Sequence, residues 1–286
     1  MAVAIAASTP RRRTASTVLL YAVAAVVLLL AVFPFYWLVT TSLKPGDQVA
    51  TNPPILIPTT ITYQNYVDVM KGEGVPRFAL NSIVVSLSST ALTVIIGSLA
   101  AYALAKTYLP YQVRHLLLLW ILITRIFPPI TTAIPYFVLL RTLQLSDTYQ
   151  GLVMTYVSYG LPFVIWLMLG FFQDLPPEIE EAAIVDGCSL WQRFRLVVLP
   201  LALPGLAVTA IFAFVYAWNE FLYASMLTSF NAKTLPVVIS GYISDKFLRW
   251  GEMSALGTAM VLPVVVFTAF AQRYLVRGLT FGAVKE

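Results

Sequence analysis

The sequence has almost none of the residues that build most catalytic and metal sites. Its 286 residues include a single cysteine, Cys188, and a single histidine, His115. One cysteine excludes a disulfide framework, and these counts exclude a Cys- or His-based metal cluster. No G-x-x-x-x-G-K-[ST] segment occurs, so the chain has no phosphate-binding P-loop. We therefore expect no enzyme activity, no metal and no cofactor bound by this chain itself.

Charged residues are also scarce. They make up 11% of the chain, whereas 59% of its residues are hydrophobic, a balance that soluble globular domains do not have. The net charge of +5 comes from basic residues at the ends of apolar runs, which is typical of membrane topology signals and not of nucleic-acid binding. The sequence predicts an all-α integral membrane protein that binds no nucleic acid.

Six apolar segments are long enough to cross a bilayer, which takes about 20 helical residues. The expected spans are 18–40, 79–105, 115–140, 151–172, 204–226 and 255–271. The first span is too long for the apolar core of a signal peptide, so we expect it to be retained. The six spans predict one transmembrane domain over residues 1–286.

Basic residues predict the orientation of these spans. Arg11–Arg13 stand directly before the first span, and more Lys and Arg flank the spans on that side than on the other. This pattern predicts that both termini and the loop 174–203 are cytoplasmic. The long loops 41–78 and 227–254 then lie outside, and loops of that length tend to be functional. The outer loop 41–78 includes a short amphipathic segment around residues 63–70.

The loop 174–203 carries the most distinctive local pattern. Pro177 suits the first position of a helix, where its missing N–H costs nothing. The acidic residues of the opening turns, which the helix dipole favours, are Glu178, Glu180 and Glu181. Gly187 predicts a left-handed stop, and Ser189 with Gln192 predicts a capping box that starts a second short helix. The resulting elbow is either a plain connector at the membrane surface or a docking element for another protein.

The second span has a small residue at every fourth position. The row consists of Ser89, Thr93, Gly97, Ala101 and Ala105. Small residues let helix backbones approach closely in lipid, so we expect another helix to pack along this row.

Two charged residues fall inside predicted spans. Arg125 lies one turn before Pro128 and Pro129, which remove backbone donors and predict a bend. It either marks a transport pathway or clamps the carbonyl groups that the prolines free. Glu220 lies in the fifth span, where polar and aromatic residues at helical spacing predict a face that could bind sugar. The members of this face are Phe212, Tyr216, Asn219, Glu220 and Tyr223. The alternative for this face is hydrogen bonding between helices beside an aromatic belt.

Several motifs together resemble a known family. Glu181-Ala182-Ala183, Asp186-Gly187, Phe194 and Leu199-Pro200 resemble the EAA loop of permease subunits of binding-protein-dependent ABC importers. Further matches are Asn81-Ser82, Phe127-Pro128-Pro129, Trp218-Asn219-Glu220-Phe221, Thr234-Leu235-Pro236 and the segment from Gln272 to Lys285. Over nearly the whole chain the sequence resembles the maltose-type carbohydrate permeases, specifically the smaller subunit of the heterodimeric pair.

The resemblance implies an importer of a di- or oligosaccharide in the bacterial inner membrane. This chain would pair with a second permease, two ATPase subunits that bind ATP–Mg would lie below, and a solute-binding protein would dock outside. The residues implied to couple to the ATPase are Glu181, Ala182, Ala183, Asp186 and Gly187. The loop 227–254 would reach the binding protein. In that family much of the sugar site belongs to the other permease, so the substrate-pathway role of Arg125, Tyr216, Asn219, Glu220 and Tyr223 stays open.

The main alternative is a secondary transporter or channel that works alone, with Arg125 and Glu220 as its ion relay. It would move solute with an ion gradient and no ATPase, but it leaves the elbow at Gly187 without a role. A membrane-embedded enzyme is disfavoured, because no acid, base or metal set converges.

Overall fold

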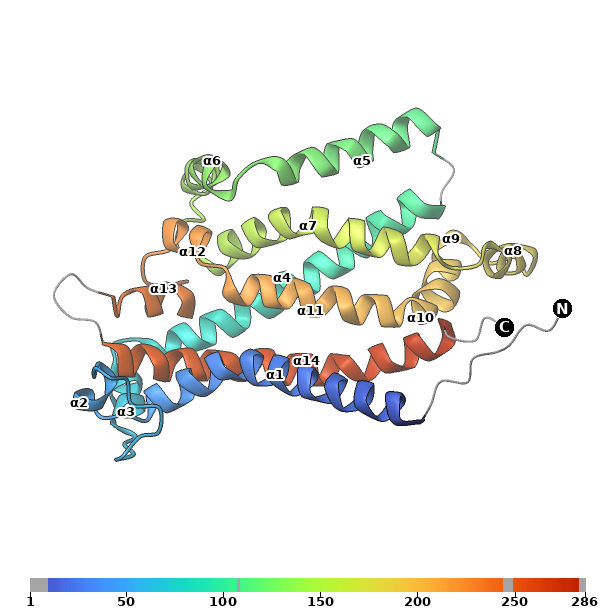
Figure 1. The fold of residues 1–286 in the computed structure, drawn as a ribbon. Helices are drawn as coiled ribbons and strands as arrows, with labels where there is room; N and C mark the ends of the chain where they lie inside the picture. Colours follow the sequence, from blue (N-terminus) through green and yellow to red (C-terminus); the bar gives the residue numbers. More distant parts are fainter. Residues whose placement is uncertain (1–9, 107–108, 244–248, 283–286) are drawn as a thin grey trace. The chain divides into compact units, whose positions relative to one another are not determined.

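In the parts of the chain that the computed structural model describes, every regular element is a helix (Figure 1). Backbone is described for residues 10–106, 109–243 and 249–282, and side chains within these ranges from Thr17 to Gln272. The chain divides into two compact units, each described by itself. The first is Met1–Val69 with Phe247–Thr258, and the second is Met70–Lys246 with Ala259–Glu286.

In the described ranges, four helices are long and apolar enough to cross a membrane. Their spanning segments are Thr17–Ser42 of α1, Val75–Lys106 (α4), Tyr149–Gln173 (α7) and Trp250–Gln272 of α14. Two bent helix pairs raise the number to six if each pair counts as one span. These pairs are α5 (Tyr111–Ile126) with α6 (Pro129–Thr142), and the segment Leu190–Leu201 with α11 (Leu203–Asn219). The predicted all-α membrane fold is confirmed, with the third and fifth spans broken.

The first unit contains α1 (Pro10–Ser42), α2 (Gly46–Val49) and most of α3 (Gln64–Lys71). The amide of Asn65 donates hydrogen bonds to the carbonyl oxygens of Ser42, at 2.9 Å, and Lys44, at 2.8 Å. The hydroxyl groups of Ser42 and Tyr66 are 2.7 Å apart. The amphipathic segment predicted around residues 63–70 is therefore a helix, and it is bonded to the end of α1.

In the second unit, α4 packs along α7. The backbones are so close that a Cβ atom on Gly97 would lie 2.5 Å from Cγ1 of Val164. A Cβ atom on Gly160 of α7 would lie 3.2 Å from the Thr93 side chain. The predicted role of the small-residue row in close helix packing is confirmed. Helix α11 packs on both α4 and α7.

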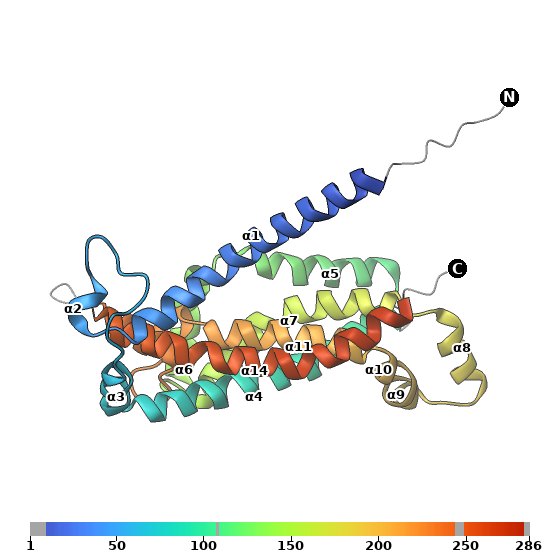
Figure 2. The ribbon, with the colours of Figure 1, turned by 60° about the horizontal axis from the view of Figure 1, so that its bottom comes forward.

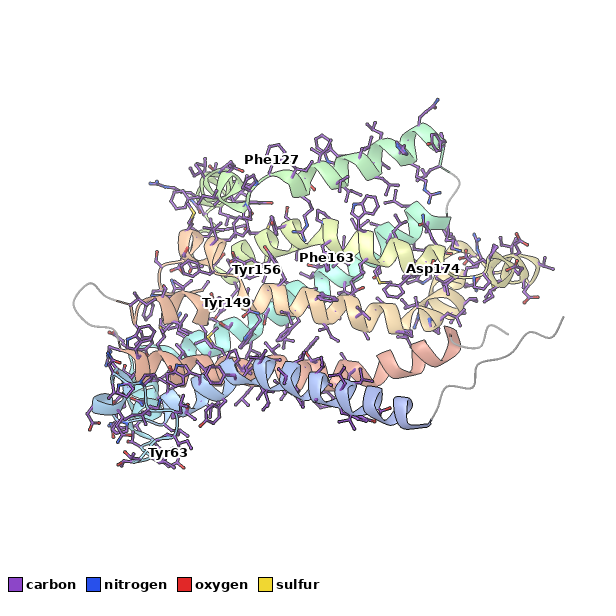
Figure 3. The ribbon with its side chains drawn as sticks, in the orientation of Figure 1. Tyr63, Phe127, Tyr149, Tyr156, Phe163 and Asp174 are labelled. Atoms are coloured by element: carbon purple, nitrogen blue, oxygen red, sulfur yellow. The ribbon has the colours of Figure 1, made fainter. Side chains whose placement is uncertain are left out.

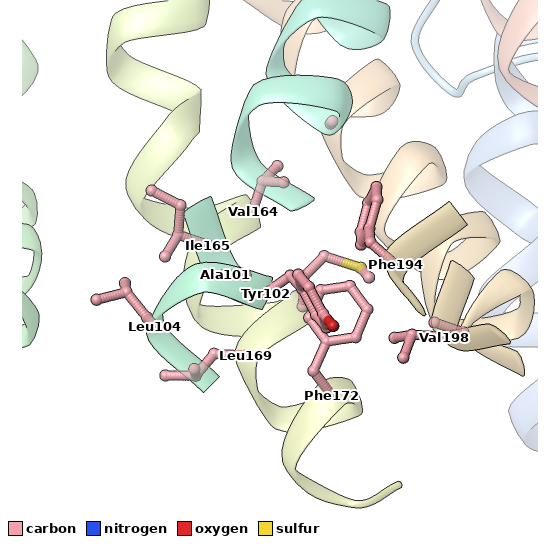
Figure 4. Close-up of a cluster of buried hydrophobic side chains, with 12 residues drawn as sticks. Ala101, Tyr102, Leu104, Val164, Ile165, Leu169, Phe172, Phe194 and Val198 are labelled. Atoms are coloured by element: carbon pink, nitrogen blue, oxygen red, sulfur yellow. The ribbon is translucent and has the colours of Figure 1, made fainter. Parts of the chain in front are cut away.

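A cluster of buried side chains joins α4, α7 and the segment after α9 at one end of this unit (Figure 4). Tyr102, Phe172 and Phe194 form its aromatic centre. The helices α8 (Pro177–Val185) and α9 (Leu190–Gln192) lie at this end (Figure 2). The other end carries α6, α12 (Leu222–Leu227) and α13 (Leu235–Ser240) (Figure 1).

Two predicted spans are interrupted or end early in the structure. The third is two helices that meet at 97°, because Pro128 and Pro129 cannot continue the hydrogen-bond ladder of α5. The fifth was predicted to continue to residue 226, but α11 ends at Asn219 and Glu220 has an extended backbone, with φ −68° and ψ 123°. The second and sixth helices are longer than predicted, since α4 begins at Val75 and α14 covers Trp250–Gly282.

Candidate functional site

The elbow, residues 177–192, folds as its local sequence predicts. Pro177 opens α8, with acidic residues in the first turn. Gly187 has φ +78°, and its N–H donates to Ile184 O while the N–H of Cys188 donates to Ala183 O. These two bonds form a Schellman motif, which favours glycine at the left-handed position. The predicted left-handed stop at Gly187 is confirmed.

The second half of the elbow starts at a capping box. Ser189 Oγ accepts from the N–H of Gln192, and the Gln192 side chain accepts from the N–H of Ser189. The capping box was predicted. The helix that it starts was predicted as one short α-helix, but α9 is followed by a π-helical segment, η1 (Arg193–Val198), and then by a short α-helix, α10 (Leu199–Leu201).

A buried carboxylate anchors the elbow to the end of α4. Oε1 of Glu180 lies 3.3 Å from Nζ of Lys106, the last residue of α4, and both side chains are almost fully buried. The Tyr102 hydroxyl donates to the other carboxylate oxygen at 3.4 Å. The Lys106 ammonium also donates to Leu175 O at 3.4 Å. The sequence placed Glu180 only among the favourable charges of the first turn and gave no sign of its partner.

Phe194 supplies an apolar anchor beside this ion pair. Its ring is 5% exposed and its centroid lies 5.0 Å from the Tyr102 ring and 6.4 Å from the Phe172 ring (Figure 4). Trp191 contacts Phe194 from the elbow itself. The elbow is therefore held to α4 and α7 by both charge and packing.

The other side of the elbow faces away from the chain. Glu181, Ala182 and Asp186 are exposed, whereas Ala183 is 5% exposed and packs inward. Large apolar residues are exposed beside them, namely Ile184, Val185, Leu190 and Trp191. Apolar side chains gathered on a protruding surface mark an interaction site. Of the residues implied to contact an ATPase, all except Ala183 are accessible.

A cavity of about 260 Å³ lies between α4, α5, α7 and α11. It sits close to the midpoints of α4 and α7, and Figure 3 labels Tyr156 and Phe163, two side chains that line it. Its polar lining consists of Ser89, Thr90, Thr93, Arg125, Tyr156 and Tyr216. The Thr90 hydroxyl is buried and has no hydrogen-bond partner among the described residues. The cavity thus places hydroxyl groups, aromatic rings and a cation together within the membrane-spanning helices.

Arg125 contacts aromatic rings, and no carboxylate among the side chains that the structure describes. Its guanidinium carbon lies 4.9 Å from the Tyr159 ring centroid and 5.7 Å from that of Phe163, and the Tyr159 ring stacks on Tyr216. Within the described part of the chain no ion pair joins it to Glu220. The carbonyl oxygens of Pro128 and Pro129 accept hydrogen bonds from threonine hydroxyls. The carbonyl groups that these prolines free lie one turn earlier, in α5, so an arginine clamp on them stays a prediction.

The predicted single face through Glu220 does not form, because α11 ends one residue earlier. The Glu220 carboxylate accepts hydrogen bonds from the N–H groups of Tyr223, at 2.8 Å, and Ala224, at 3.1 Å, and so caps α12. The Tyr223 side chain is buried and its hydroxyl pairs with Thr132 of α6. Asn219 bonds back to Val215 in its own helix. Of this set, Phe212 and Tyr216 line the cavity with Arg125.

In the described ranges, no three His, Cys, Asp or Glu side chains lie close enough to hold a metal ion. The chain offers two candidate sites, the elbow and the cavity.

Comparison with known proteins supplies a family context for both sites. Residues 93–281 match the family model described as binding-protein-dependent transport system inner membrane component. The trehalose transport system permease protein SugB of Mycobacterium tuberculosis is 38% identical, covering 89% of this chain and 93% of its own. The trehalose/maltose transport system permease protein MalG of Thermococcus litoralis is 33% identical, covering 90% and 92%. A chain of a bacterial ABC transporter involved in the import of the acidic polysaccharide alginate shares the fold, with a TM-score of 0.76 and 22% identity over 94% of this chain and 99% of that chain.

Proposed function

This chain belongs to the family of binding-protein-dependent transport system inner membrane components, and on that premise we propose that it is one permease subunit of an ATP-driven ABC importer for a sugar of the di- or oligosaccharide class. It is a multi-pass inner membrane protein. The substrate class is supported by relatives whose names specify trehalose or maltose transport and which align along most of this chain.

The importer would contain partners of four kinds. A second permease completes the translocation pathway, two ATPase subunits hold ATP–Mg, a solute-binding protein delivers the sugar outside, and lipid surrounds the spans. Both termini and the elbow face the cytoplasm in this arrangement, as the basic residues before the first span favour. In this arrangement ATP is hydrolysed by the ATPase subunits and not by this chain.

The elbow carries the proposal. Its inner side is fixed to α4 by Glu180 and Lys106, and its outer side presents Glu181, Ala182 and exposed apolar residues such as Val185. A short element that is anchored on one side and apolar on the other is suited to be moved by a partner and to pass that movement to the spans. We infer that closure of the ATPase dimer displaces the elbow and thereby alternates access to the pathway.

The cavity is our candidate for the part of the pathway that this chain contributes. The rings of Phe163 and Tyr216, which line the cavity, offer flat faces for sugar rings, and the guanidinium of Arg125 and the hydroxyl of Thr90 offer hydrogen bonds to sugar hydroxyls. Glu220 has no place in this pathway, because its carboxylate oxygens are used in capping α12.

Cross-linking through Cys188 tests the role of the elbow. Cys188 is partly exposed in the turn after α8, so a cleavable cross-linker on its thiol should capture the ATPase in the assembled complex. The matched control is Cys188→Ser with Ser146→Cys, which moves the thiol to an exposed position in the connection between α6 and α7. Capture from position 146 but not from Cys188 would contradict the proposal.

The backbone conformation of Gly187 gives a second test. No atom lies within 4 Å of a Cβ on Gly187 or on Gly46, but only Gly187 has positive φ. Gly187→Val should therefore strain the elbow by about 1–2 kcal/mol and lower sugar uptake per ATP hydrolysed. Gly46→Val should leave this ratio unchanged, and an unchanged ratio in Gly187→Val would refute the coupling role.

A further inference from the structure

The carboxylate of Asp147, in the connection between α6 and α7, holds the loop that follows α12. It accepts hydrogen bonds from the N–H groups of four consecutive residues, Ser229 to Ala232, at 2.9–3.3 Å. Asp147 itself has φ 54°, and its N–H donates to Leu227 O. Consecutive N–H groups that converge in this way form an anion-binding nest, which here is filled by the chain's own carboxylate.

Side chains at the start of α4 hold the same loop from a second direction. Asn81 is fully buried, and its amide donates to Asn231 O at 2.9 Å and Lys233 O at 2.8 Å. Its oxygen accepts from the Tyr149 hydroxyl at 2.5 Å. Ser82 Oγ accepts from the N–H of Leu235. The segment Ser229–Lys233, which has no regular secondary structure, is therefore fixed at both ends.

This fixed segment carries cations interleaved with aromatic rings. The Arg77 guanidinium lies 5.1 Å from the Phe230 ring centroid and donates to the Asn231 side chain. Phe230 meets Phe78 edge to face at 5.6 Å, and the Lys233 ammonium lies 5.7 Å from the Phe78 centroid. Phe230 and Arg77 are exposed. Among the side chains described, no carboxylate pairs with either cation, and the charge of Asp147 is directed into the loop backbone.

We propose that Arg77, Phe230 and Lys233 form a preassembled docking surface for an acidic, carboxylate-bearing face of the solute-binding protein, and that Asp147 is the positioning residue that keeps this surface in shape. The inference rests on the proposed function, which puts the loop 227–254 outside. Unpaired cations favour an acidic partner. A loop that is already ordered loses little conformational freedom on docking, which strengthens binding.

Charge reversal in the complete importer, reconstituted in nanodiscs with its solute-binding protein, tests the surface. The readout is the concentration of sugar-loaded binding protein that half-saturates ATPase stimulation. Arg77→Glu combined with Lys233→Glu should raise this concentration roughly tenfold or more, and should make it less dependent on salt. The control is Arg141→Glu, an exposed position on α6, which should shift it much less.

Asp147→Asn tests the positioning role. The neutral amide cannot match a carboxylate as acceptor of four N–H groups, so hydrogen exchange at residues 229–232 should speed up. The concentration of binding protein that half-saturates ATPase stimulation should rise, although Arg77 and Lys233 are not substituted in this variant. The proposal would be overturned if the double charge reversal and the unmodified importer needed the same concentration of binding protein for half-saturation. It would also be overturned if removal of anionic lipid restored the normal value in the double reversal. Absence of any stimulation in the unmodified importer would instead overturn the proposed function.

Discussion

The ion pair between Lys106 and Glu180 makes a quantitative prediction about the elbow. Their charged atoms are 3.3 Å apart, and their side chains are 14% and 10% exposed. Removal of one partner from a buried pair leaves an uncompensated charge and costs about 3–5 kcal/mol. Because both side chains keep some exposure, we expect Glu180→Gln to cost about 3 kcal/mol, at the lower end of that range.

The assay is thermal unfolding of the purified importer together with sugar uptake per ATP hydrolysed. A loss of about 3 kcal/mol should lower the melting temperature by about 6 °C, and uptake per ATP should fall because the elbow is released from α4. The charge swap Lys106→Glu with Glu180→Lys should recover at least half of both losses. Glu252→Gln is the control, since its partner Arg249 has a side chain that is 57% exposed, and such pairs contribute about 1 kcal/mol or less.

Two outcomes would refute this reasoning. If Glu180→Gln is as stable as the unmodified protein, the ion pair makes no net contribution to the free energy of unfolding. If Glu180→Gln is destabilised but uptake per ATP is unchanged, the contact is structural and does not transmit the movement of the elbow.

Three further predictions concern other parts of the second unit. Gly97→Ala should destabilise the α4–α7 contact by about 1–3 kcal/mol, because its Cβ would meet Val164, whereas Gly170→Ala has free space and should not lower the melting temperature. Burial raises the pKa of Asp147, but the four backbone N–H donors outweigh burial and lower its pKa below 3.8. Protection of residues 229–232, measured by hydrogen exchange and corrected for the intrinsic rate, should therefore stay constant between pH 8 and pH 5. It should be lost only as the pH falls through this lowered pKa. In Asp147→Asn the protection should be weak at every pH. Arg125→Met should reduce uptake while the binding protein still stimulates the ATPase, and normal uptake in this variant would exclude a substrate contact for Arg125.

The sequence by itself determined the features that depend on nearby residues. Apolar length predicted the membrane helices, and the small-residue row predicted the close approach of α4 and α7. Pro177, Gly187 and the Ser189–Gln192 pair predicted the start, bend and restart of the elbow, because a cap or a left-handed turn involves only residues a few positions apart. The EAA-like motif of the elbow, and the family that it indicates, could be identified from the sequence for the same reason.

Only the tertiary structure decided which of the polar residues act together. Sequence spacing put Glu220 on one helical face with Tyr216, but a helix end at Asn219 turned its carboxylate into a cap and left Arg125 with aromatic partners. The tertiary structure also brought Glu180 to Lys106, and Asp147 to the loop after α12. These partners are far apart in the chain, and a buried charge takes whichever donor or counter-charge the packing of the helices places beside it, so no local pattern could have named them.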